Sequence, residues 1–125
     1  QAALMGCAAV LLINGSDLIS PELTTLTRGA FAFLILLDAF AMVSGEFAMP
    51  HASDSAAKAA RAISHGKYKC HFWVGSLMVG HLIPFLFVVL AFTPATALVA
   101  ALCCIAGLYF YEYAFVMAPQ EVPNS

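Results

Sequence analysis

Residues 28–47 read RGAFAFLILLDAFAMVSGEF, and this stretch decides the fold. A helix that crosses a bilayer needs about 20 mostly apolar residues, and Asp38 is the only charged residue in the interior of this run. Backbone N–H and C=O groups cannot face lipid unpaired, and the run lacks the alternation of barrel strands. We therefore predict a membrane-spanning helix over 28–47, which Met49-Pro50 ends.

Three further apolar runs follow the same pattern, over 2–14, 70–92 and 95–117. Of the 125 residues, 62% are hydrophobic and 10% are charged, which is too little polar surface for a small soluble domain. We expect an all-α fold, a transmembrane helical bundle formed by residues 1–125 as one four-helix unit. It would have three full spans and one truncated N-terminal span. Because the chain starts at Gln1 inside an apolar run, we expect it to be the C-terminal part of a larger subunit.

The polar segment 51–69 predicts a short amphipathic helix on the membrane surface, with Ser53 as its N-cap. Four of the five basic residues lie in this segment, which the positive-inside rule assigns to the cytoplasm. They are Lys58, Arg61, Lys67 and Lys69. The C-terminus is then expected on the same side. The net charge of −2 gives no basic excess, so nucleic-acid binding is not indicated.

Ionisable side chains inside a membrane span are costly and are therefore functional candidates. Asp38 lies halfway along the 28–47 run, and Glu46 follows two turns later on nearly the same helix face. The pair is a candidate route for protons between the middle of the bilayer and the cytoplasmic side. Alternatively, Asp38 is a buried hydrogen-bond acceptor that joins helices, and Glu46 lies in water at the interface.

His71 and His81 lie on the 70–92 run, about 15 Å apart along the helix axis. The other three runs contain no histidine, so we expect no haem with two axial histidines from this chain alone. His81 precedes Pro84, which leaves the carbonyl group near Gly80 without a helical donor. His81 is a candidate partner for that carbonyl or for the carbonyl of a quinone.

Tyr109, Glu112 and Tyr113 share one face of the 95–117 run. Glu112 is a third candidate for a proton pathway, and the two tyrosines are candidates for a polar network or for quinone binding. The tyrosines also fit the aromatic belt at a membrane interface. The four cysteines show no metal-ligand spacing, and we expect neither a metal site nor a self-contained catalytic site.

Two segments carry a resemblance to a known family. Residues 67–75 read KYKCHFWVG and are followed by Gly80 and Pro84, and residues 111–125 read YEYAFVMAPQEVPNS. The first resembles the penultimate helix of the NrfD/PsrC family of membrane subunits from polysulfide-reductase-type complexes. The second is similar to that family's C-terminal signature. The likeness covers roughly residues 65–125, and the earlier runs match in hydropathy and order.

The resemblance implies a subunit that passes electrons between membrane quinone, such as menaquinone, and an iron–sulfur subunit. It implies a further molybdopterin or cytochrome subunit, no haem in this chain, and the inner membrane of a prokaryote. Family members have two four-helix bundles, and this chain would be the second. A non-catalytic membrane anchor for a soluble redox subunit is the alternative, and half of a small transporter is a third hypothesis, although no inverted repeat is evident.

Overall fold

The longest helices begin where the sequence supplies a cap. The computed structural model describes residues 1–123, and α2 (Pro21–Val43) begins after Ser20, whose hydroxyl accepts a hydrogen bond from the Leu23 N–H. Proline at the first helical position has no N–H to leave unpaired. Thr93 caps α5 (Pro94–Gln120) in the same way, and Thr96 completes a reciprocal capping box. Both helices are longer than the expected spans 28–47 and 95–117.

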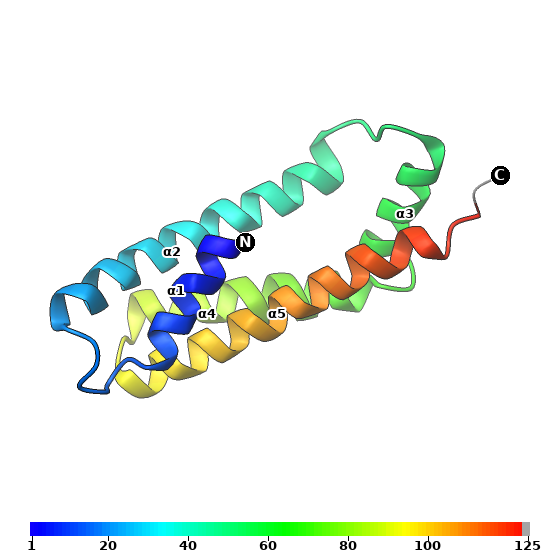
Figure 1. Ribbon diagram of the computed structural model, residues 1–125. Helices are drawn as coiled ribbons and strands as arrows, with labels where there is room; N and C mark the ends of the chain where they lie inside the picture. Colours follow the sequence, from blue (N-terminus) through cyan, green and yellow to red (C-terminus); the bar gives the residue numbers. More distant parts are fainter. Residues whose placement is uncertain (124–125) are drawn as a thin grey trace.

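The expected all-helical class is confirmed for residues 1–123, which contain helices and no strand. Figure 1 shows α2 and α5 running along the molecule, with the short α1 (Ala2–Leu12) packed against both of them. Within the described residues, three helical stretches are long and apolar enough to cross a membrane. They are Pro21–Ala48, His71–Leu90 and Pro94–Gln120. These are the features of a multi-pass membrane protein.

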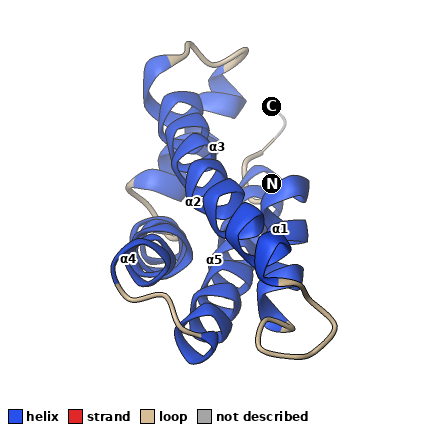
Figure 2. Ribbon diagram, turned by 90° about the vertical axis from the view of Figure 1, so that its left-hand side faces the viewer, coloured by secondary structure: helices blue, strands red, loops and turns tan. Residues whose placement is uncertain are grey.

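Two stretches depart from the α-helical geometry that the sequence leads us to expect. Ser44–Ala48 (η1) continues α2 as a π-helix, and His71–Leu82 (η2) is a π-helix that precedes α4 (Ile83–Leu90). Pro84 lies directly after the change from π to α winding. A change of winding leaves a main-chain group without its partner, and proline has no N–H to lose at that point. Figure 2 shows η2 and α4 end-on beside α5.

The tightest helix contact joins η2 to α5. A Cβ atom added to Gly107 would lie 2.1 Å from the Cα atom of Gly80, so the two main chains touch at this crossing. Ala97, Ala100 and Ala101 are fully buried further along α5. Small residues let helices approach closely in a membrane, where dispersion contacts replace the hydrophobic effect between helices. Gly80, Gly107 and these alanines therefore serve close packing between helices.

Arg28 fastens α2 to the end of α4. Its Nε donates to the Val88 carbonyl at 2.8 Å, a second guanidinium nitrogen reaches the Val89 carbonyl at 3.2 Å, and the group lies 4.7 Å from the centre of the Phe92 ring. The last carbonyls of a helix have no helical donors, so the guanidinium satisfies groups that would otherwise be unpaired.

Gly15, with φ of +96°, turns the neighbouring loop against Pro94.

The expected surface segment 51–69 contains α3 (Asp54–Ser64), which lies across the opposite end of the bundle from these loops (Figure 1). Ser53 caps it by accepting from the Ala56 N–H, and Ala59 and Ile63 are buried against the bundle. The Trp73 indole N–H donates to the Ser64 carbonyl at 2.8 Å. The amphipathic helix is therefore anchored to the start of η2.

A cluster of charged and polar groups closes the same end. Lys67 Nζ and Tyr68 Oη both donate to Glu121 Oε1 at 2.7 Å. The hydrogen bonds from Lys67 and then Tyr68 hold the pKa of the Glu121 carboxyl below its ordinary value of 4.5. A group with a lowered pKa contributes stability above its ordinary pKa and loses that contribution as the pH falls through the lowered value.

We therefore expect this end of the protein to loosen as the pH falls below 4.5, the ordinary pKa of this carboxyl group. The fluorescence of Trp73, whose indole is bonded to Ser64, reports the change. Glu121→Gln should flatten the acid response, because the variant has no carboxylate to protonate. Glu22→Gln, at the start of α2, is the matched control and should keep it. An unaltered acid response in Glu121→Gln would contradict the assignment.

Candidate functional site

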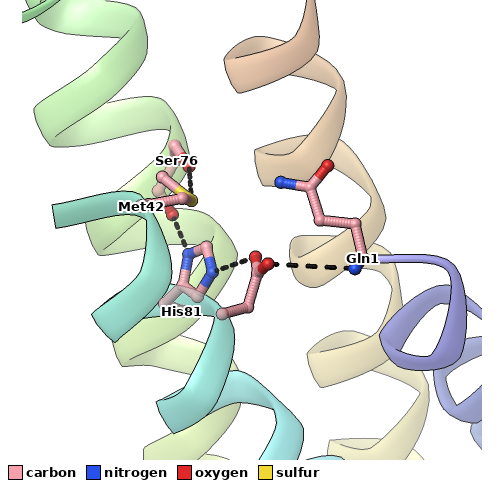
Figure 3. Close-up of polar contacts among 5 residues, drawn as sticks. Gln1, Met42, Ser76 and His81 are labelled. Atoms are coloured by element: carbon pink, nitrogen blue, oxygen red, sulfur yellow. Dashed lines mark hydrogen bonds and ion pairs between the residues drawn. The ribbon is translucent and has the colours of Figure 1, made fainter. Parts of the chain in front are cut away.

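Asp38 and His81, from two different spanning stretches, meet each other inside the bundle. His81 is 3% exposed, and its Nε2 atom lies 3.0 Å from Oδ2 of Asp38 on α2. Its other ring nitrogen, Nδ1, lies 2.9 Å from the main-chain oxygen of Ser76. Figure 3 shows the imidazole held between that carbonyl and the carboxylate, with the Gln1 main-chain nitrogen 3.9 Å from the second carboxylate oxygen. Asp38 and His81 therefore form one polar unit inside an apolar bundle.

The π-helix explains the position of His81. In this winding a residue lies above the carbonyl five positions earlier, and His81 follows Ser76 by five. The Ser76 hydroxyl is fully buried and contacts the Met42 sulfur at 3.7 Å. Because η2 approaches α5 at Gly80, the ring of the next residue is held firmly and faces α2. The local winding thus orients the imidazole toward the carboxylate.

The hydrogen-bond partners determine how many protons the pair holds. A carbonyl oxygen only accepts, so Nδ1 of His81 carries a proton. Nε2 of His81 and Oδ2 of Asp38 lie 3.0 Å apart. A hydrogen bond between these atoms requires one proton, carried by either the ring or the carboxyl group. Without that proton, a lone pair would face a carboxylate in a medium of low dielectric. A proton on either of these two atoms completes the hydrogen bond between α2 and η2.

Both members of the pair border hollows in the bundle. Asp38 lines a cavity of about 210 Å³ between α1 and α2, together with Leu4 and Leu37. His81 lines another of about 190 Å³ on the far side of α2, together with Leu77 and Phe85. A cavity of this size has room for water where polar partners are present. The contact between Asp38 and His81 thus borders a hollow at each of its two residues.

Glu46 lies apart from this pair, at the end of the same helical stretch. It is in η1, about 12 Å along the helix from Asp38 at 1.5 Å per residue. Among the described residues no hydrogen bond joins the two carboxylates, and Glu46 Oε2 is buried without any partner. It lines a cavity of about 480 Å³ beside Tyr111 and α3. The predicted proton route would therefore need intervening groups or water.

The candidates on α5 do not reach the Asp38–His81 pair. Tyr109 and Tyr113 are 65% and 42% exposed on the outer face of the helix, and Glu112 is exposed between them. The ring of Tyr113 stacks on His71 at 5.7 Å, and Nδ1 of His71 is buried without a partner in the described chain. These residues form a separate aromatic and acidic strip on the outside of the bundle.

Several residues that contact the candidate site residues escape sequence reasoning. Ser76 and Met42 belong to no motif, and only the five-residue spacing of Ser76 and His81 around a π turn would have indicated the contact between those two residues. No group of three or more potential metal-ligating side chains occurs within the described residues 1–123. Comparisons of the chain with protein-family models, curated proteins and solved structures give no match.

Proposed function

We propose that this chain belongs to a quinone-interacting integral membrane subunit of a respiratory oxidoreductase. In this proposal the subunit passes electrons between membrane quinone or quinol and an iron–sulfur partner, with accompanying proton movement. The observation that carries the proton part is the contact between Asp38 and His81, two groups able to gain and lose protons, 3.0 Å apart inside the spanning bundle. The redox part rests on the resemblance of residues 67–75 and 111–125 to the NrfD/PsrC family.

The fit to a quinone differs between the candidate residues. Both ring nitrogens of His81 are engaged by Ser76 and Asp38, so neither is free for a quinone carbonyl in this conformation. Tyr109 and Tyr113 lie on the outer face of α5, where a quinone dissolved in lipid arrives. A quinone supplies the two-electron chemistry when bound, and the protein's part is to orient it and to hold or accept its protons.

The proposed surroundings follow from charge. Lys58, Arg61, Lys67 and Lys69 lie at the α3 end, and by the positive-inside rule they support a cytoplasmic position for this end in the proposal. The family resemblance supports the inner membrane of a prokaryote. The C-terminal end of α5 lies beside α3 on that side. Asn124 and Ser125, the end of the expected signature, lie outside the described residues. An iron–sulfur subunit and a molybdopterin or cytochrome subunit are the proposed partners.

A non-catalytic membrane anchor is the second candidate. The observation that favours an anchor is that Asp38 and His81 are hydrogen-bond partners of each other. Two polar groups that served only to join α2 to η2 would be paired in the same way. In that case the pair stabilises the bundle and never releases its proton.

Purification of the complex from native membranes tests the proposal. We expect iron–sulfur and molybdopterin or cytochrome subunits to co-purify with the chain, and reduced menaquinone analogue to transfer electrons to the iron–sulfur clusters. A chain that purifies alone in mild detergent would refute the redox proposal. Partners present without quinol oxidation or quinone reduction would favour the anchor.

A further inference from the structure

The largest hollow described in the protein lies apart from the Asp38–His81 pair. It is enclosed by η1, α3 and the last turns of α5, and its volume of about 480 Å³ falls in the range of small-molecule sites. We call it the Glu46 cavity, and it is defined by one polar wall and one apolar wall. The polar wall consists of Glu46, His51, Ser55 and Tyr111. The apolar wall includes Ala56, Ala59, Ile63 and Phe115.

The polar wall contains an acceptor that lacks a donor. Oε2 of Glu46 is buried without a donor at hydrogen-bond distance among the described residues, and the nearby Tyr111 hydroxyl on the same wall interacts with this carboxyl group without satisfying Oε2. A buried carboxylate oxygen that is left unpaired is costly, and most such atoms in proteins are paired. A ligand with an O–H or N–H group would supply the missing donor, because Oε2 of the carboxyl group accepts.

A second, smaller hollow meets the same two polar residues from the other side. Its volume is about 260 Å³, and it is lined by Glu46 and His51 together with Arg61 and His65 at the basic end. Phe115, by contrast, lines the Glu46 cavity from α5 and is 53% exposed on the surface of that span. Glu46 thus lines both hollows. The Glu46 cavity reaches the lipid-facing surface at Phe115, and the smaller hollow reaches the basic end at Arg61.

We infer that the Glu46 cavity binds the head of a membrane-dissolved amphipathic molecule whose O–H or N–H donates to Oε2 of Glu46. The apolar wall receives the ring or chain next to that donor, and Phe115 marks the side from which it enters. Two membrane components share this chemistry: a hydroquinone, with a phenolic O–H, and an ethanolamine phospholipid, with an ammonium N–H. The hydroquinone case rests on the proposed function, whereas the phospholipid case does not.

The test measures binding to the purified complex in nanodiscs. The probes are a short-chain naphthohydroquinone and its dimethyl ether, and phosphatidylethanolamine and phosphatidylcholine. Each pair shares its apolar part, but only the first member carries a donor hydrogen. We expect the complex to bind one donor-bearing probe at least about tenfold more tightly than its methylated counterpart, as the loss of a hydrogen bond to a charged group predicts.

Two variants locate that binding. Glu46→Gln should weaken it about tenfold by removing the charge, and Ala56→Leu should do so by filling the cavity. Ala57→Leu adds the same bulk to α3 in the smaller hollow and should leave the binding unchanged. Elution of each variant at the wild-type position in size-exclusion chromatography controls for folding.

The outcomes separate the two proposals. Equal binding of donor and methylated probes, or unchanged binding in Ala56→Leu, would overturn the cavity assignment while quinol turnover by the complex could still support the proposed function. Specific binding of phosphatidylethanolamine by a complex without quinol activity would support the cavity assignment and refute the redox proposal.

Discussion

The complex carrying Asp38→Asn is expected to fold normally and to lose at least about a hundredfold in quinol-coupled proton uptake, the loss typical of removing a group that transfers protons. Asparagine has nearly the same shape as aspartate, and its amide N–H can donate to Nε2 of His81 across the gap that is now 3.0 Å. The contact between α2 and η2 therefore survives. The variant cannot place a mobile proton between Oδ2 and Nε2, so only proton transfer fails.

Stopped-flow proton uptake with a pH indicator dye measures this loss, and infrared difference spectra supply an independent signature. A carboxyl band that appears during turnover in the wild type should be absent in Asp38→Asn. Asp54→Asn, in the first turn of the exposed helix α3, makes the same chemical change outside the bundle and should leave uptake unaltered. Wild-type proton uptake in Asp38→Asn would assign the pair to helix joining and support the anchor.

Apolar run length predicts the spanning helices well, because lipid leaves a chain with few alternatives. The composition around Asp38 also identifies it as a functional candidate, since a carboxylate inside a span must have a partner. The sequence does not reveal that the partner is His81. The two residues are 43 positions apart, and their meeting depends on how α2 crosses η2.

The π-winding of η2 is the main reason that the contact between Asp38 and His81 escapes sequence reasoning. Hydrophobic periodicity in an all-apolar run carries little information on winding, and only Pro84 indicates where the winding changes. Glu112 is the opposite case, a residue that the sequence indicates as a candidate although it lies outside the Asp38–His81 site. Its position inside a span made it a candidate, but the apolar residues around it could not indicate that it faces outward. Orientation within a uniformly apolar helix is decided by packing, chiefly at Gly80 and Gly107.

Gly107→Ala is expected to give the largest loss of stability from a single methyl group. The added Cβ would lie 2.1 Å from Cα and 2.6 Å from N of Gly80, far inside van der Waals contact, and both obstacles are main-chain atoms. The helices must therefore separate. Overpacking of this kind costs about 1–3 kcal/mol, which exceeds the roughly 1 kcal/mol that alanine gains over glycine in a helix.

Gly29→Ala provides the matched control, because a Cβ at this position of α2 meets no atom within 4 Å. It should be neutral or slightly stabilising, and thermal unfolding in detergent compares the two variants directly. Separation of η2 from α5 would also move His81, the neighbour of Gly80, away from Asp38. Gly107→Ala should therefore lower proton uptake as well as the melting temperature, whereas Gly29→Ala should change neither. If the two variants melt alike, the contact between Gly80 and Gly107 does not limit the packing, and the orientation of His81 must depend on the π-winding alone.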